Sequence, residues 1–172
     1  YTQDPLQERQ TNPETGVIHK YAGRALLILS GGCAINCRYC FRRHFNYHDN
    51  TTPLKPDSSA YQYLKNNTSI KELILSGGDP LLYDDDQLSR VMNTLEGLDH
   101  IKRLRIHTRL PIVIPQRITS TFTDLLRHTR FHATLVVHCN HPQELDTHTA
   151  HAFDQIRAAN IDLLNQSVLL KG

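Results

Sequence analysis

The 172-residue chain has no tryptophan, no strong net charge and no long hydrophobic run. Its apolar stretches are far shorter than the ~20 residues that a membrane-spanning helix needs, so we expect no membrane association. The formal net charge of +2 predicts no nucleic acid or other polyanion as a partner. The apolar and charged fractions are ordinary for a globular protein, and the length suffices for one domain with a core.

Cysteine is also scarce, but three of the four cysteines form one run, Cys33, Cys37 and Cys40, while Cys139 lies far along the chain. Three neighbouring thiols can hold three irons of a cubic iron–sulfur cluster and leave the fourth iron open to a small molecule. Clusters with four cysteine ligands suit plain electron transfer. The run therefore indicates chemistry at a metal, in a reducing compartment that we expect to be the cytoplasm.

Zinc binding and disulfide formation are the two other uses of such thiols. Structural zinc usually takes four ligands as two separated pairs, and no second pair is present. His44 or His48 could complete a site of three cysteines and one histidine, so zinc is the alternative metal. Disulfides are disfavoured, because three clustered cysteines cannot all pair and no secretory signal precedes them.

Short apolar runs alternate with helical patterns along the chain. Five runs predict strands, the first of them continuous enough to be buried on both faces. They cover residues 25–29, 72–76, 104–108, 133–138 and 161–164. Helices are expected over 85–98, 120–128, the stretch from Pro142 to about residue 159, and 58–65. Asp84 with Gln87 predicts a capping box, and Asn160 predicts a helix end.

This alternation predicts a parallel sheet, either as a barrel or as an open doubly wound sheet. Polar or glycine-rich motifs follow nearly every predicted strand, at residues 31–33, 76–79, 107–109, 138–141 and 165–167. Function at the carboxyl end of every strand is typical of a barrel, whereas an open sheet concentrates it at one switch point. We therefore expect an α/β fold, a partial (β/α) TIM-type barrel of about five parallel strands.

Four longer motifs resemble one enzyme family. They are residues 33–43, 75–81, 109–119 and 164–170, and they occur in the family's order along nearly the whole chain. The chain resembles the lysine 2,3-aminomutases, which are radical S-adenosylmethionine (SAM) enzymes. Residues 104–115 and 19–21 are most similar to the branch that supplies β-lysine for modification of elongation factor P. The resemblance implies a radical SAM core over residues 20–172, preceded by an arm or linker over residues 1–19.

The resemblance also implies the reaction and its cofactors. Cys33, Cys37 and Cys40 would hold a [4Fe–4S] cluster whose fourth iron is chelated by SAM. The enzyme would be an isomerase that converts L-α-lysine to β-lysine while pyridoxal phosphate (PLP) holds the substrate. Such cofactors supply the difficult chemistry, and the protein supplies orientation and exclusion of water. Implied partners are lysine, an electron donor such as flavodoxin or ferredoxin, and an elongation factor P ligase.

The SAM-binding residues implied by the family begin with the turn Ser76, Gly77, Gly78 and Asp79. Glycines let a backbone approach a ligand closely, and their N–H groups can meet its charged end. Taken alone, the turn could equally be an ordinary strand-to-helix connection. The family positions that contact SAM are completed by His138, Gln166 and Tyr39, the last at a position where the family often has histidine.

Arg42 matches the arginine that receives the substrate carboxylate, and a guanidinium group can bind a carboxylate through two hydrogen bonds. Lys20, Tyr21 and Arg24 match positions near PLP, although the family usually has arginine at the position of Lys20. The lysine that binds PLP and the acids that bind the substrate's side-chain amine lie further along the family sequences. We therefore expect the C-terminal part of the barrel to be missing here, and the catalytic residue is unknown.

Two alternatives remain open at this stage. One is a radical SAM enzyme that acts on another amino acid. The other is a zinc or iron–sulfur module without catalysis.

Overall fold

A computed structural model describes residues 3–51 and 53–168 and contains one six-stranded sheet in the order β1-β2-β3-β4-β5-β6. The strands are β1 (Val17–Tyr21), β2 (Arg24–Ser30), β3 (Glu72–Gly77), β4 (Arg103–Thr108), β5 (His132–Val137) and β6 (Asp162–Asn165). β2 to β6 are parallel, and only β1 is antiparallel to its neighbour. The five predicted parallel strands are confirmed, in a sheet that does not close, as expected for part of a barrel.

The connections supply the helices. These are α1 (Tyr47–Asn50), α2 (Ser59–Asn66), α3 (Asp85–Glu96), α4 (Leu110–Val113), α5 (Ser120–Arg127) and α6 (Thr147–Ala158). Four single turns of 3-10 helix complete the set, at Arg9–Thr11, Pro80–Leu82, Pro115–Arg117 and Pro142–Glu144. The predicted capping box is present, with Asp84 and Gln87 satisfying each other's backbone N–H groups at the start of α3. Asn160 has a positive φ of 59° after α6, which confirms the predicted helix end.

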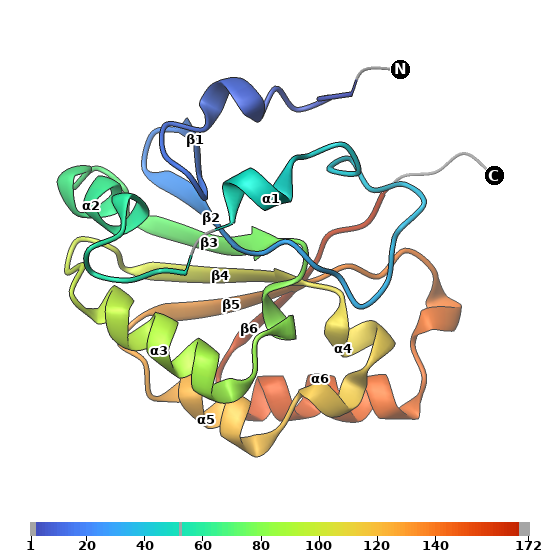
Figure 1. Ribbon diagram of the computed structural model, residues 1–172. Coiled ribbons are helices and arrows are strands. Elements are labelled where there is room, and N and C mark those ends of the chain that lie inside the picture. The colour runs from blue at the N-terminus through green and yellow to red at the C-terminus, as the bar shows by residue number, and fades with distance from the viewer. Residues whose placement is uncertain (1–2, 52, 169–172) are drawn as a thin grey trace.

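The two faces of the sheet differ. Helices α3, α5 and α6 cover one face (Figure 1). Side chains in register across the parallel strands form the core against these helices, and they are Leu27, Leu75, Ile106, Leu135 and Leu163. The alternate residues face the other side, where the N-terminal segment and α1 lie (Figure 1). This second face is only partly covered: Leu26 and Ile74, which pair in register, both line a cavity.

The N-terminal segment is more ordered than an arm or linker. Val17 and Ile18 are buried, and β1 pairs with β2 through Val17–Leu27 and Ile18–Leu26. The sequence shows too short an apolar run at this point to predict a strand. Residues 17–19, assigned to the arm, therefore belong to the sheet.

The described residues contain no helix that is both long enough and apolar enough to cross a bilayer.

Candidate functional site

A cavity of about 240 Å³ lies at the carboxyl ends of the parallel strands, beneath the loop that follows β2. This loop carries the three neighbouring cysteines and curls over the strand ends (Figure 1). Each of the five parallel strands, or the segment that follows it, contributes to the lining. The contributors include Cys33 after β2, Ser76 in β3, His107 in β4, His138 after β5 and Gln166 after β6. The sequence-based expectation that polar groups gather at the strand ends is confirmed.

Cys33, Cys37 and Cys40 all line this cavity and are all free thiols. Burial, together with Asp79 and the other two thiols, raises the pKa of Cys33 to about 11. A positively charged metal would offset this effect at Cys33, since metal ligation deprotonates a thiol. Among the described residues no three His, Cys, Asp or Glu side chains are already arranged to hold a metal ion. The fit to an iron–sulfur cluster therefore rests on the donor set, three thiols of one loop that line one cavity.

The glycine turn after β3 holds the start of the cysteine loop. Gly78 N–H donates to the Ser30 carbonyl at 2.6 Å, and Asp79 N–H donates to the Gly32 carbonyl at 2.7 Å. Gly77 has a φ of +124°, and a Cβ at Gly78 would lie 1.9 Å from the Gly32 oxygen. The glycines are thus required by contact between two backbone segments. The Gly78 N–H, one of the groups expected to meet a ligand, is used here by a protein carbonyl.

Asp79 joins the turn after β3 to the end of β4. Its buried carboxylate accepts hydrogen bonds from Thr108 Oγ1 at 2.7 Å, Arg109 N–H at 2.8 Å and Leu81 N–H at 3.0 Å. A buried carboxylate needs several such donors. Asp79 lines the cavity, but its described hydrogen bonds fix the two strand ends relative to each other.

Arg42 lies in the cavity wall and is held by two partners. Its Nε and Nη2 donate to the two carboxylate oxygens of Glu8, each at 2.7 Å. Its Nη1 donates to Ser76 Oγ at 3.1 Å. The side chains of Arg42 and Glu8 are each only 9% exposed. A guanidinium group beside the three thiols is suited to bind an anionic group of a ligand.

Arg109, at the start of α4, contacts the cysteine loop directly. Its Nη1 donates to Cys37 Sγ at 2.9 Å and also to Tyr39 Oη. Its Nη2 forms an ion pair with Glu144 at 2.8 Å. Burial alone would raise the pKa of Glu144, but the Asn140 N–H and Arg109 lower it, so Glu144 is an anion. Tyr39 therefore takes part in a network around Cys37, and Asn140 donates to the same hydroxyl.

Two buried imidazoles line the cavity, His107 and His138, with ring centroids 5.8 Å apart in an edge-to-face contact. The Nε2 atom of each is buried without a hydrogen-bond partner. Burial, reinforced by His138 and Arg105, lowers the pKa of His107 to about 4, against a weaker opposite effect of Gln166. Burial also lowers the pKa of His138. Both rings are neutral near pH 7, and each offers an unused nitrogen to a polar ligand.

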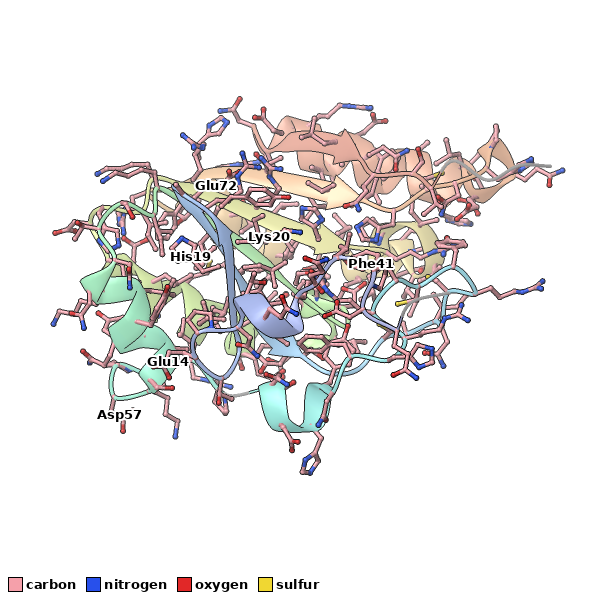
Figure 2. The ribbon with its side chains drawn as sticks, turned by 90° about the horizontal axis from the view of Figure 1, so that it is seen from above. Glu14, His19, Lys20, Phe41, Asp57 and Glu72 are labelled. Atoms are coloured by element: carbon pink, nitrogen blue, oxygen red, sulfur yellow. The ribbon has the colours of Figure 1, made fainter. Side chains whose placement is uncertain are left out.

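The residues expected near PLP lie away from the cysteine loop. Tyr21 pairs with Arg24 at the amino end of β2, and neither they nor Lys20 line the cavity. Lys20 Nζ donates to the Leu6 carbonyl at 2.8 Å. Figure 2 shows Lys20 well separated from Phe41 of the cysteine loop. Arg24 instead belongs to an ion-pair group with Glu72, 3.8 Å away, which also pairs with Arg105 at 2.5 Å.

Within the part of the chain that the structure describes, the cavity lining does not supply the aldehyde-binding amine that PLP requires. No lysine among the described residues lines the cavity. Lys171 lies outside the described residues. We therefore derive no step through PLP from this chain.

The zinc alternative gains no support from the histidines near the loop. His48 is 96% exposed in α1, and its Nδ1 lies 2.9 Å from Asp49 Oδ1. His44 does not line the cavity.

Several side chains of the site were not assigned from the sequence. The cluster 107–109 is a strand-end motif in the sequence, but its pattern predicts no particular role for His107 or Arg109. The motif 138–141 likewise contained Asn140. Glu8 and Glu144 carry no local signal, because their partners Arg42 and Arg109 lie 34 and 35 residues away.

Comparison with known proteins agrees with this geometry. The Radical SAM superfamily model matches residues 27–125. An L-lysine 2,3-aminomutase of Haemophilus influenzae is 50% identical over the whole chain, which covers 51% of that protein. The L-lysine 2,3-aminomutase of Escherichia coli is 46% identical over 99% of the chain and 50% of its own length. That of Clostridium subterminale is 36% identical over 99% of the chain and 41% of its own length.

The chain thus spans about half the length of the most similar of these relatives. The superfamily match begins within β2 and runs through α3 and β4 into α5. It includes the three cysteines, the glycine turn and Arg109, all of which line the cavity. Because this match covers more than half of the 172 residues, the chain belongs to the radical SAM superfamily.

Proposed function

We propose that the protein is a lysine 2,3-aminomutase, an isomerase that converts L-α-lysine to β-lysine. One observation carries the proposal: a single cavity collects the three cysteine thiols, Arg42 and the polar ends of β3 to β6. The similarity of the whole chain to L-lysine 2,3-aminomutases supports the choice of reaction. The cofactors are a [4Fe–4S] cluster and SAM, with PLP as a third whose lysine these described residues do not provide.

In this proposal Cys33, Cys37 and Cys40 hold three irons of the cluster. When bound, the cluster and SAM supply the one-electron chemistry that removes a hydrogen atom from the substrate. Ser76 and the turn that follows it form one side of the SAM site. His138 and Gln166 form the other, with Tyr39 beside Cys37. The neutral imidazole of His138 can donate or accept a hydrogen bond without adding charge to the site.

Arg42 receives the substrate carboxylate. A guanidinium has five N–H donors, and Arg42 uses three of them on Glu8 and Ser76. The remaining two, one on Nη1 and one on Nη2, can bind a carboxylate through two hydrogen bonds. Because the side chain is only 9% exposed, this contact is little weakened by competing water.

The cavity indicates less clearly which substrate side chain it selects than how it binds the substrate carboxylate. Asp79 is the one carboxylate among the described lining residues, and its oxygens already accept three protein donors. A radical SAM enzyme acting on another amino acid is therefore the second candidate, and substrate competition separates the two.

We propose further that the protein acts in the cytoplasm and takes its electron from a flavodoxin or ferredoxin. We also propose that its β-lysine supplies an elongation factor P ligase, as in the branch named EpmB. Lys20, Tyr21 and Arg24 remain proposed PLP contacts. Reducing surroundings suit three exposed or half-buried free thiols.

The test is anaerobic purification of the full-length gene product and reconstitution with iron and sulfide. We expect a brown protein with about four irons per chain, reductive cleavage of SAM, and conversion of L-lysine to β-lysine, with no corresponding β-amino acid formed from ornithine or alanine. Cys33→Ala should lose the cluster. Its matched control, Cys139→Ala, should keep it, because Cys139 lies outside the cavity lining. A colourless protein that holds one zinc ion contradicts the proposal.

A further inference from the structure

Glu8 is an unusual residue for the polar N-terminal segment, because it is buried and pairs with the site. It is 7% exposed and directly precedes the 3-10 turn Arg9–Thr11. Its own N–H donates to Asp4 Oδ1 at 3.0 Å, which fixes the backbone at this point. The segment lies over the face of the sheet opposite helices α3, α5 and α6 (Figure 1). The N-terminal segment therefore brings a buried carboxylate to Arg42, which itself lines the cavity.

The Glu8–Arg42 pair has a defined geometry. Both carboxylate oxygens are used, one by Nε and one by Nη2 of Arg42, each at 2.7 Å. This side-on pairing fixes the plane of the guanidinium group as well as its position. Ser76 Oγ, 3.1 Å from Nη1, adds a third contact from β3. A flexible side chain is thus held by two segments that are far apart in the sequence.

The geometry distinguishes two roles for Glu8. A carboxylate that imitated the substrate would occupy the N–H groups that the substrate needs. Glu8 instead takes the Nε side of Arg42 and leaves one donor on each terminal nitrogen. A buried arginine without its partner would also carry an uncompensated charge and lose its fixed orientation. The contact therefore favours a supporting role over competition with the substrate.

We propose that Glu8 is a positioning residue that orients Arg42 so that its two remaining N–H groups receive the substrate carboxylate. This inference rests on the proposed function, in which Arg42 binds the carboxylate of lysine. It assigns the N-terminal segment a part in substrate recognition. Glu8 does not line the cavity and acts only through Arg42.

The experiment compares Glu8→Gln with wild type in the full-length, reconstituted gene product. The amide keeps the size of the side chain but loses the charge and one acceptor oxygen. We expect KM for L-lysine to rise about tenfold or more, since Arg42 loses a charged partner and one of the acceptors that orient it. We expect kcat, iron content and SAM affinity to change much less. L-lysinamide, which has no carboxylate, should be handled similarly by wild type and variant.

Glu14→Gln is the matched control, because Glu14 lies in the same segment but well away from Phe41 of the cysteine loop (Figure 2). It should keep the wild-type KM. An unchanged KM in Glu8→Gln overturns the inference, and a lowered KM shows that Glu8 competes with the substrate. If Glu8→Gln does not fold, Glu8→Asp takes its place, and a KM equal to wild type overturns the inference. A wild-type protein that does not turn over lysine instead overturns the proposed function.

Discussion

Arg109 Nη1 donates a hydrogen bond to Cys37 Sγ at 2.9 Å, and Glu144 holds the same guanidinium group at 2.8 Å from its other side. The middle cysteine of the loop thus has a fixed positive charge beside its sulfur. Arg109 also lies with Cζ 5.7 Å from the Tyr39 ring centroid. Hydrogen bonds and net charge around the sulfurs set the reduction potential of an iron–sulfur cluster. Arg109, at the start of α4, should therefore influence the reduction potential of the proposed cluster.

Arg109→Gln should make the cluster harder to reduce, because it removes a positive charge that favours the electron-rich state. We expect the midpoint potential to fall by on the order of 60 mV, the one-electron equivalent of a tenfold change. The midpoint potential of Arg109→Lys, which keeps the charge, should lie between those of wild type and Arg109→Gln. A redox titration followed by electron paramagnetic resonance measures the shift. Arg127→Gln, on the outer helix α5, is the control, and equal potentials in Arg109→Gln and wild type would count against the contact.

Gly78→Ala should displace the cysteine loop. The new Cβ would lie 1.9 Å from the Gly32 oxygen, a backbone atom that cannot rotate away. Overpacking of this kind costs about 1–3 kcal/mol, and iron retention should fall with the loop. Gly32→Ala is the control, since its Cβ would lie 3.2 Å from the end of the exposed Leu82 side chain and 3.8 Å from Ser30 Oγ, and would meet no backbone atom within 4 Å. Denaturant unfolding and iron analysis check both effects, and wild-type values for Gly78→Ala would contradict them.

Asp79→Asn should loosen the ends of β3 and β4. Only one of the two terminal atoms of the amide can accept a hydrogen bond. The hydroxyl of Thr108 or the backbone N–H of Arg109 would therefore lose its acceptor in a buried environment. Leaving buried donors unsatisfied costs about 1–3 kcal/mol. Asp86→Asn, an exposed aspartate in the first turn of α3, should be close to neutral. The midpoint of denaturant unfolding measures both, and equal effects of the two substitutions would rule out this role of Asp79.

The sheet could be predicted because its apolar runs reflect burial. Leu73 and Leu75 of β3 are fully buried, and buried hydrophobic residues also mark β2, β4 and β5. β1 could not be predicted, since Val17 and Ile18 are its only buried hydrophobic residues and their burial depends on pairing with β2. A two-residue run carries no period, so local pattern alone cannot assign it.

The site could be predicted only in part. Motifs that follow strands placed the thiols, the glycine turn and His138 in one cavity, because parallel strands bring their carboxyl ends together. The internal use of Gly78 N–H and Asp79 could not be predicted, since it depends on the path of the loop after β2. Glu8 was missed for the same reason: tertiary structure brings it to Arg42.

The acid sensitivity of the fold should depend on His107. Its pKa is about 4 in the folded protein against an ordinary 6.5, with burial as the main cause. Below pH 6.5 the unfolded chain therefore binds a proton that the folded chain does not, so stability is lost as the pH falls from about 6.5 to about 4. One pKa unit corresponds to about 1.4 kcal/mol, so the loss over this window is at most roughly 3.5 kcal/mol.

His107→Gln should remove most of that loss. We expect the difference in unfolding free energy between about pH 7.5 and about pH 5 to be smaller in the variant by roughly 1–2 kcal/mol. Some acid sensitivity should remain, because burial also lowers the pKa of His138. His151→Gln is the control, since His151 is exposed on α6 and should leave the wild-type dependence intact. Denaturant unfolding at both pH values measures this, and NMR of the imidazole nitrogens gives an independent reading. A His107 ring that titrates near pH 6.5 would show that the cavity does not hold it neutral.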